Sequence, residues 1–341
     1  MIPDFDPSAL REITTLLSVP KKITIIPHAK PDGDAMGSSL GLYNYFIQKK
    51  HEVKVVSPTD YPDFLTWMKG NNNVIIHNNK STNAADAIKD ADIIFCLDFN
   101  APDRVEKLEQ DLIRSKAKKI MIDHHLSPAN FCDFTFAFPE SCATCEIIYH
   151  FIFQLDGKKY FNKAIAECLY AGIMTDTGSF RFPSMTADTH RVVAALIEAG
   201  VENSKVHELI FDNFSEDRLH FLGFCLKDRL VVLNEFNTAY ISITKEEMNK
   251  YNHLAGDTEG IVNYGLGIKG IRFSAFFSEK DDLVKISFRS RGDFSAKEIA
   301  AEHFDGGGHK NAAGGKSETS LEETVGKFIS LLPQYKEKLT E

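Results

Sequence analysis

Short apolar runs alternate with helix-like stretches through the first half of the chain, and this alternation limits the fold more than any other feature. The apolar runs cover residues 23–27, 53–57, 91–98 and 119–123, and the helical stretches cover residues 34–49, 103–115 and 143–155. Such alternation is typical of a parallel sheet with helices packed on both faces. We therefore expect an α/β fold for this half of the chain.

Three of the apolar runs end on an acidic or histidine residue. His28 follows the first run, Asp98 closes the third, and Asp123 closes the fourth, where it begins the triplet Asp123, His124 and His125. The carboxyl ends of neighbouring parallel strands meet at one edge of a sheet, where ligands commonly bind. We therefore expect these side chains to converge on one site.

Further candidates lie at the ends of predicted helices. Asp32 and Asp34 follow His28 within one turn, and Asp176 lies where the helical stretch 162–175 meets a glycine. Taken singly, Asp34 and Asp98 could each be a helix cap, because Asp favours that position. Likewise, a lone histidine of the triplet could belong to the core, and Asp176 could be a turn residue. Their joint occurrence at four separate element ends favours a common site.

The donor types indicate a metal centre. Carboxylates this close repel one another and favour a cation between them. Oxygen and imidazole donors without thiolates suit Mn²⁺ or Mg²⁺, and there are enough carboxylates for two ions. Two divalent ions about 4 Å apart can share a bridging hydroxide and hold a phosphoryl group for in-line attack.

Bulk properties exclude several other functions. A length of 341 residues favours roughly two domains. The net charge of −9 argues against extended contact with duplex nucleic acid. The amino terminus lacks a signal-peptide pattern, and the apolar stretches are shorter than the ~20 residues of a membrane span. We expect a cytoplasmic protein with no membrane contact. Cys142 and Cys145 form a C-x-x-C pair, which could be a redox pair or half of a zinc site. No second such pair is present to complete a zinc site, and we expect inert buried thiols.

The last third of the chain changes character. Strands are predicted over residues 229–235, 238–244, 270–278 and 283–290, followed by a helix over 295–303, a glycine-rich loop and a helix over 321–332. We therefore predict a first domain over residues 1–200, a helical linker over 201–225 and a second, smaller α/β domain over 226–341.

The second domain carries a possible anion site. Arg289 and Arg291 are two residues apart, so they share one face of a strand, and guanidinium groups bind phosphate bidentately. The glycine-rich segment 306–315 contains Gly307, Gly308 and His309. Glycines let backbone N–H groups approach an anion closely. Read alone, such a loop is usually only a turn and such arginines a solvated face.

Four ordered motifs make the chain resemble the DHH phosphoesterase superfamily. They contain His28, Asp32 and Asp34; Asp98; the triplet Asp123, His124 and His125; and Asp176 within the Thr-Asp-Thr-Gly sequence 175–178. The resemblance implies that His28, Asp32 and Asp98 hold one metal ion and that Asp34, Asp98, His124 and Asp176 hold the other. It further implies that Asp123 orients a neighbouring imidazole and that His125 faces the scissile phosphate.

The glycine-rich segment resembles the signature of the DHHA1 domain. By that resemblance, Arg289, Arg291, His309 and the loop with Gly307 and Gly308 bind the substrate across an interdomain cleft. The two-domain pairing is similar to the stand-alone, RecJ-like nano-RNase branch. That branch uses Mn²⁺ to hydrolyse short single-stranded oligoribonucleotides to 5′-monophosphates, and several members also convert adenosine 3′,5′-bisphosphate (pAp) to AMP. Linear or cyclic diadenylate is an alternative substrate, and a non-catalytic binding module is an alternative of another class. The sequence leaves open whether the chain forms a homodimer.

Overall fold

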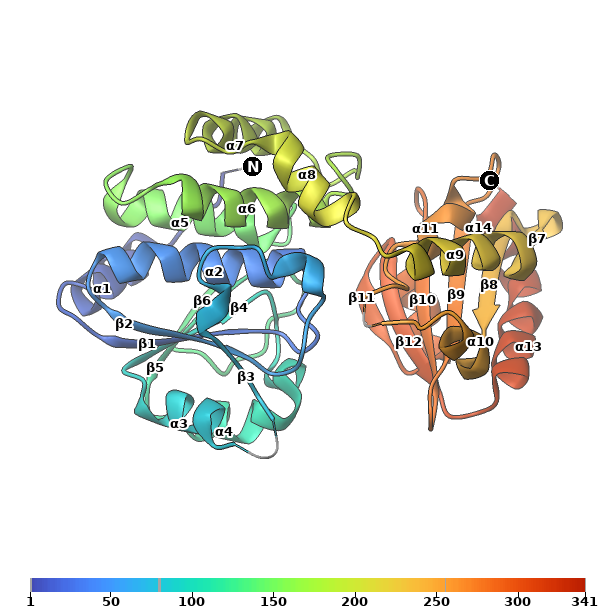
Figure 1. The fold of residues 1–341 in the computed structure, drawn as a ribbon, viewed down its shortest axis with the longest axis horizontal. Helices are drawn as coiled ribbons and strands as arrows, with labels where there is room; N and C mark the ends of the chain where they lie inside the picture. Colours follow the sequence, from blue (N-terminus) through green and yellow to red (C-terminus); the bar gives the residue numbers. More distant parts are fainter. Residues whose placement is uncertain (1, 79–80, 255, 341) are drawn as a thin grey trace. The chain divides into compact units, whose positions relative to one another are not determined.

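The chain divides into two compact units, which are described separately (Figure 1). The computed structural model describes residues 2–78, 81–254 and 256–340. The first unit spans Met1–Asn213 and the second spans Phe214–Glu341. The predicted linker region contains α8 (Asn203–Phe211) in the first unit and α9 (Glu216–Phe224) in the second. Within the described ranges, no helix combines the length and apolar character that a bilayer span requires.

The first unit is built on a six-stranded parallel sheet in the order β3-β2-β1-β4-β5-β6. The order runs in opposite directions from β1 and from β4, so the gap between these two strands is the topological switch point of the sheet. The parallel sheet predicted from the sequence is confirmed. Its strands are β1 (Lys22–Pro27), β2 (Glu52–Ser57), β3 (Val74–Ile76), β4 (Ile93–Leu97), β5 (Lys118–Asp123) and β6 (Phe134–Ala137).

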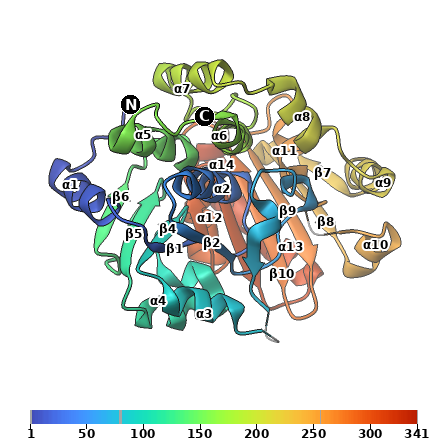
Figure 2. The same ribbon diagram turned by 60° about the vertical axis from the view of Figure 1, so that its left-hand side comes forward.

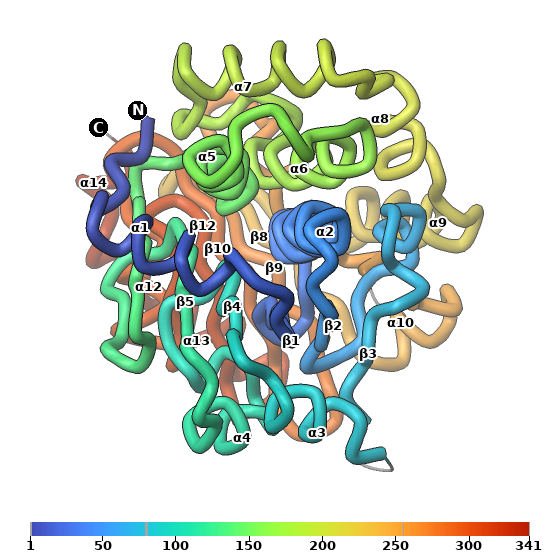
Figure 3. The backbone as a smooth tube through the Cα atoms, turned by 90° about the vertical axis from the view of Figure 1, so that its left-hand side faces the viewer, coloured from blue at the N-terminus to red at the C-terminus, as the bar shows by residue number. Residues whose placement is uncertain are grey.

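Helices cover both faces of this sheet (Figure 2). Figure 3 shows α2, α5 and α6 on one side of the strands and α3 and α4 on the other. Side chains along each strand point alternately to the two faces of the sheet. Ile25 and Phe95 pack in the core with α2, α5 and α6, whereas Ile26 and Cys96 pack with α3 and α4. The helices are α1 (Pro7–Leu16), α2 (Gly33–Gln48), α3 (Asn83–Asp90), α4 (Glu109–Arg114), α5 (Thr144–Asp156), α6 (Lys163–Asp176) and α7 (Ala187–Glu198).

The helix predicted over residues 103–115 is interrupted. A 3₁₀ segment, η3 (Pro102–Leu108), precedes α4, and Glu106 within it has φ 48° and ψ −117°. A non-glycine residue with positive φ cannot continue a right-handed helix. The single predicted helix is therefore wrong, and the chain turns at Glu106.

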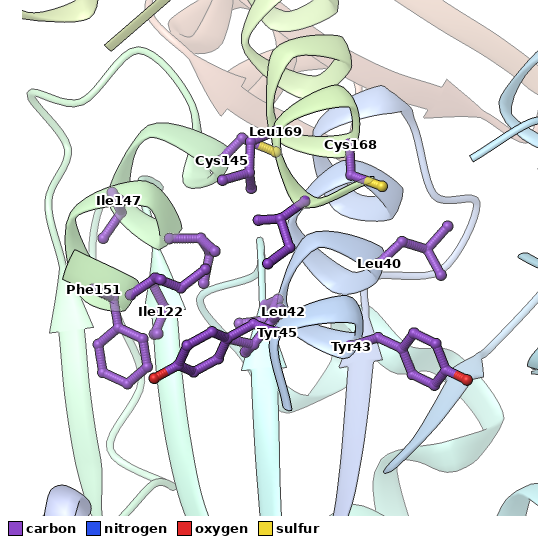
Figure 4. Packing of buried hydrophobic residues seen from close by; sticks show 14 of the residues in the cluster. Leu40, Leu42, Tyr43, Tyr45, Ile122, Cys145, Ile147, Phe151, Cys168 and Leu169 are labelled. Carbon is purple, nitrogen blue, oxygen red and sulfur yellow. The ribbon is translucent and has the colours of Figure 1, made fainter. Parts of the chain in front are cut away.

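Glycines let α2 and α6 pack closely above the sheet. A Cβ on Gly37 would lie 2.5 Å from the Cys168 carbonyl oxygen, and one on Gly172 would lie 2.2 Å from Cys145 Sγ. Figure 4 shows Leu40 of α2 with Cys168 and Leu169 of α6 in the adjoining core. This close packing brings the first turn of α2, with Asp34, next to α6.

The second unit contains a mixed six-stranded sheet in the order β11-β12-β10-β9-β8-β7, in which only β8 and β9 pair in parallel. The apolar cores on its two faces contain residues of α9, α10 and α11 on one side and of α12, α13 and α14 on the other. The elements are β7 (Leu230–Leu233), β8 (Thr238–Ile243), α10 (Lys245–Lys250), α11 (Ile261–Leu266), β9 (Phe273–Glu279), β10 (Val284–Ser290), α12 (Ala296–His303), β11 (Gly307–His309), β12 (Ala312–Ser317), α13 (Leu321–Leu331) and α14 (Lys336–Thr340).

The predicted glycine-rich loop is a β-hairpin. Residues Gly307–His309 form β11, which pairs antiparallel with β12, so that Gly307 faces Gly314 and His309 faces Ala312. Glycine has a low strand propensity, so the sequence pattern hides this strand. The expectation of a loop over this segment is wrong.

Candidate metal centre

All six residues predicted as metal ligands come together at the carboxyl ends of β1, β4 and β5. His28, Asp32 and Asp98 form one group and Asp34, His124 and Asp176 form another, and within each group the potential ligand atoms lie within 4.8 Å of one another. Residues that follow different strands converge because those strands are adjacent and parallel at the switch point.

Asp98 lies between the two groups. Its Oδ2 is 3.5 Å from Nε2 of His28, and its Oδ1 is 3.4 Å from Nε2 of His124. The side chain is 2% exposed, and the backbone has a φ of 64° directly after β4. Left-handed backbone is uncommon for a non-glycine residue and often marks a functional site. This carboxylate therefore reaches both groups at once.

Two of the histidines have the hydrogen bonds expected of metal ligands. His28 Nδ1 lies 2.9 Å from the Ala29 carbonyl oxygen, and His124 Nδ1 lies 3.3 Å from the Ser141 carbonyl oxygen. Because a carbonyl only accepts, each Nδ1 carries the proton and donates. In both rings Nε2 then faces carboxylates. This donation of the second ring nitrogen to a carbonyl is typical of ligating histidine.

Asp32 and Asp34 have different structural partners. Asp32 is the N-cap of α2, and its Oδ1 accepts hydrogen bonds from the backbone N–H groups of Asp34 at 3.0 Å and Ala35 at 3.1 Å. The cap that the sequence left open for Asp34 thus belongs to Asp32. Asp34 is almost fully buried and accepts from the N–H groups of Thr144 at 2.6 Å and Cys145 at 2.8 Å.

The start of α5 was not recognised in the sequence as part of the site. Ala143, at its N-cap, has no side-chain oxygen, so the Asp34 carboxylate satisfies the first N–H groups of α5 instead. The Thr144 hydroxyl also donates to Asp98 Oδ1 at 2.9 Å. A helix that begins without a capping side chain was the one available signal that an acceptor comes from elsewhere.

Asp123 and His125 form a hydrogen-bonded pair. His125 Nδ1 lies 2.7 Å from Asp123 Oδ1 and 3.8 Å from Asp98 Oδ1. Asp123 is fully buried, and its Oδ2 has no hydrogen-bond partner among the residues that the structure describes. The contact with Asp123 fixes the orientation of the His125 ring.

The ionisation of the cluster reflects its crowding. Burial lowers the pKa of His28 and of His124, but the surrounding carboxylates outweigh it and raise both to about 9. Burial and the charge of Asp98 raise the pKa of Asp34 well above its usual value, and burial raises the pKa of Asp176 to about 6. Burial opposes the ionisation of Asp98, yet the hydrogen bond with His28 and the charge of His124 hold its pKa below the usual range.

These observations fit bound divalent cations. Buried carboxylates that repel one another are stabilised by a cation, and oxygen and imidazole donors suit Mn²⁺ or Mg²⁺. The nearby Cys142 and Cys145 do not add a thiolate, because burial raises the pKa of both thiols. The two cysteines are buried and not disulfide-bonded.

In the second unit, two of the predicted substrate-binding residues lie in register across the sheet. Arg289 of β10 and His309 of β11 both pair with Ala312 of β12. In-register residues of neighbouring strands point to the same face. Arg289 is half-buried, whereas Arg291 is exposed and lies one residue beyond the end of β10.

Comparison with known protein families gives the class of protein: a hydrolase of the phosphoesterase type. The chain matches the DHH family, N-terminal domain, over residues 22–173 and the DHHA1 domain over residues 239–338. The chain belongs to the DHH family, in the branch that also carries a DHHA1 domain.

Individual proteins similar to this chain show which members of the family it resembles. Proteins named bifunctional oligoribonuclease and PAP phosphatase NrnA are 28% identical over 312 residues in Bacillus subtilis (89% of this chain, 91% of that protein) and 31% identical over 304 residues in Thermus thermophilus (88% and 85%). A crystal structure of an exopolyphosphatase-related protein from Bacteroides fragilis has a TM-score of 0.94 and 38% identity, covering 99% of each chain. RecJ of Thermus thermophilus, solved with Mn²⁺, shares the fold with a TM-score of 0.55 and 13% identity, covering 97% of this chain and 56% of RecJ.

Proposed function

We propose that this protein is a divalent-metal-dependent phosphoesterase that hydrolyses short oligoribonucleotides to nucleoside 5′-monophosphates and also converts pAp to AMP. The observation that carries the proposal is the position of Asp98, whose two oxygens face the two separate ligand groups. The names of the Bacillus and Thermus relatives support the choice of substrates.

In this proposal His28, Asp32 and Asp98 hold one ion, and Asp34, Asp98, His124 and Asp176 hold the other. Such a pair of ions supplies a nucleophile at neutral pH and neutralises charge on the phosphoryl group. We take Mn²⁺ as the ion, with Mg²⁺ as the other candidate; the RecJ structure with Mn²⁺ supports the use of a divalent ion.

The remaining polar groups of the site bind and orient the substrate phosphate. His125, held by Asp123, faces the phosphate that is cleaved and stabilises negative charge as it develops. Burial of Asp34, Asp98 and Asp123 keeps bulk water from the carboxylates, which strengthens each electrostatic contact.

The second unit binds the rest of the substrate. Arg289 and Arg291 contact phosphate, and His309 shares the face of Arg289 on the sheet. The surrounding hairpin, with Gly307 and Gly308, brings backbone close to the ligand. An acidic chain with a net charge of −9 favours substrates of a few nucleotides over long duplexes.

A substrate panel tests the proposal. Wild-type protein with Mn²⁺ is incubated with pAp, the dinucleotide pApA, RNAs of three to five nucleotides and a long RNA duplex, and the products are separated by chromatography. We expect AMP from pAp, 5′-monophosphates from the short RNAs and an intact duplex. If pApA alone were hydrolysed, the proposal would be wrong and the protein would be a dinucleotide phosphodiesterase. No turnover of any substrate, with Mn²⁺ bound, would indicate a binding module.

A further inference from the structure

We infer that Thr144 is a positioning residue that forces Asp98 to bridge two metal ions instead of chelating one. This inference rests on the proposed function and extends it to a residue outside the ligand set. This residue at the start of α5 contacts one ligand carboxylate through its side-chain hydroxyl and a second through its backbone N–H.

The contacts of Thr144 span both ligand groups. Its N–H donates to Asp34 Oδ2 at 2.6 Å, and its hydroxyl donates to Asp98 Oδ1 at 2.9 Å. Thr144 is fully buried, so water does not compete for either bond. Thr144 therefore fixes the spacing between Asp34 and Asp98.

The hydroxyl also limits how Asp98 can bind cations. A carboxylate oxygen has two lone pairs, and on Oδ1 the Thr144 hydroxyl occupies one of them while His124 Nε2 lies 3.4 Å away. Oδ2 faces His28 at 3.5 Å. The hydroxyl thus takes up one direction on Oδ1, and because the two oxygens face different ligand groups, we expect them to serve different ions. Without the hydroxyl, Asp98 can rotate and chelate a single ion with both oxygens.

Thr144→Val isolates this role. Valine has the shape of threonine but lacks the hydroxyl, and it keeps the backbone N–H that donates to Asp34. Thr144→Ser restores the hydroxyl and should behave as wild type. Thr24→Val is the matched control, because Thr24 is also buried and its hydroxyl donates to the Ala87 carbonyl at 2.8 Å, on the face of the sheet covered by α3.

Mn²⁺ titration tests the inference. Calorimetry of the metal-free proteins gives the number and affinity of the ions, and electron paramagnetic resonance detects spin coupling between two neighbouring Mn²⁺ ions. We expect Thr144→Val to lose about 10–100-fold in affinity for one ion, the range typical of residues behind a ligand, and to lose the coupled signal. Thr144→Ser and Thr24→Val should keep both, although Thr24→Val should unfold at a lower temperature than wild type.

Two results would distinguish an error in the inference about Thr144 from an error in the proposed function. If Thr144→Val binds two coupled ions with wild-type affinity, the inference is wrong while the proposed function stands. If the wild type itself binds no Mn²⁺, the proposed function is wrong. Should Thr144→Val fail to fold, Thr144→Ala makes the same test, because it too retains the N–H to Asp34 and lacks the hydroxyl; wild-type binding by Thr144→Ala would equally overturn the inference.

Discussion

Nε2 of His28 lies 3.5 Å from Oδ2 of Asp98, and both side chains are more than nine-tenths buried. Asp98 is held ionised and His28 is held protonated, because each raises the stability of the other's charged form. A cation that binds between them must displace the imidazole proton. Protons and metal ions therefore compete for this site.

Metal affinity should consequently rise with pH. His28 and His124 both have a pKa of about 9 in the metal-free protein, so at pH 7 both carry a proton that binding releases. We expect the Mn²⁺ affinity to increase between pH 6.5 and 9, with proton uptake by the buffer. Calorimetry in two buffers of different ionisation enthalpy measures the released protons. Affinity that is flat over this range would contradict the assignment of both histidines as ligands.

The metal-free protein should show the opposite trend in stability. A histidine whose pKa is raised from 6.5 to about 9 on folding stabilises the folded state fully below pH 6.5 and loses this effect as the pH rises to 9. Melting temperatures of the chelator-treated protein should fall over that range. A rise would mean that these imidazoles are neutral in the metal-free fold.

Asp98→Ala should abolish turnover, because it removes a carboxylate that faces both ligand groups. Asp98→Asn, which keeps the shape and one oxygen acceptor, should also be inactive, because it lacks the negative charge. Rates are measured on a trinucleotide RNA with saturating Mn²⁺. Near-wild-type rates in either variant would refute the shared role of Asp98.

Asp123→Asn should lower kcat about 10–100-fold, as expected for a partner that orients a functional imidazole. The number of bound ions should stay at the wild-type value, because Asp123 Oδ1 is hydrogen-bonded to His125, which we do not assign as a metal ligand. Asp133→Asn is the control, since Asp133 bonds to Lys118 and Lys119 at the opposite end of β5. Equal kcat in the Asp123→Asn variant and wild type would remove Asp123 from the mechanism.

Gly172→Ala should destabilise the first unit. The added Cβ would lie 2.2 Å from Cys145 Sγ and 3.0 Å from Asp34 Oδ1, and overpacking of this kind costs about 1–3 kcal/mol. Displacement of Asp34 should also weaken Mn²⁺ binding. In α13, a Cβ on Gly326 would meet no described atom within 4 Å, so Gly326→Ala should stabilise by about 0.5–1 kcal/mol. Denaturant unfolding compares the two, and equal stabilities would contradict the close helix packing.

Arg291→Ala should raise KM more than it lowers kcat, because we place Arg291 on parts of the substrate away from the reacting phosphorus. Lys285→Ala is the control, since Lys285 is exposed near the start of β10, the strand that Arg291 directly follows. Steady-state kinetics on a trinucleotide gives both constants. A decrease confined to kcat would assign Arg291 to the chemical step.

In the first unit, the sequence predicted β1, β2, β4 and β5 and missed β3 and β6. Strands β1, β4 and β5 each contain a run of apolar residues, so their pattern is visible. β3 and β6 have three and four residues, too few for a period to show. The hairpin of β11 and β12 depends on cross-strand pairing between glycines, and the break at Glu106 depends on a backbone conformation. Neither feature is encoded in a local pattern of hydrophobicity.

The ligand candidates could be predicted because they lie at the ends of strands and helices, at positions that the sequence pattern reveals. The role of Thr144 could not be predicted. Its function depends on contacts with Asp34 and Asp98, which are 110 and 46 residues away in the chain. The sequence around Thr144 shows only the start of a helix. The contacts exist because α2 and α5 approach the same end of the sheet, which is a property of the fold.

Anomalous diffraction at the manganese absorption edge, from crystals grown with excess Mn²⁺, measures the central claim directly. The account predicts two peaks in each chain, one bordered by His28, Asp32 and Asp98 and the other by Asp34, Asp98, His124 and Asp176, with Asp98 touching both. No peak at these residues, or a single peak that Asp98 does not contact, would contradict it.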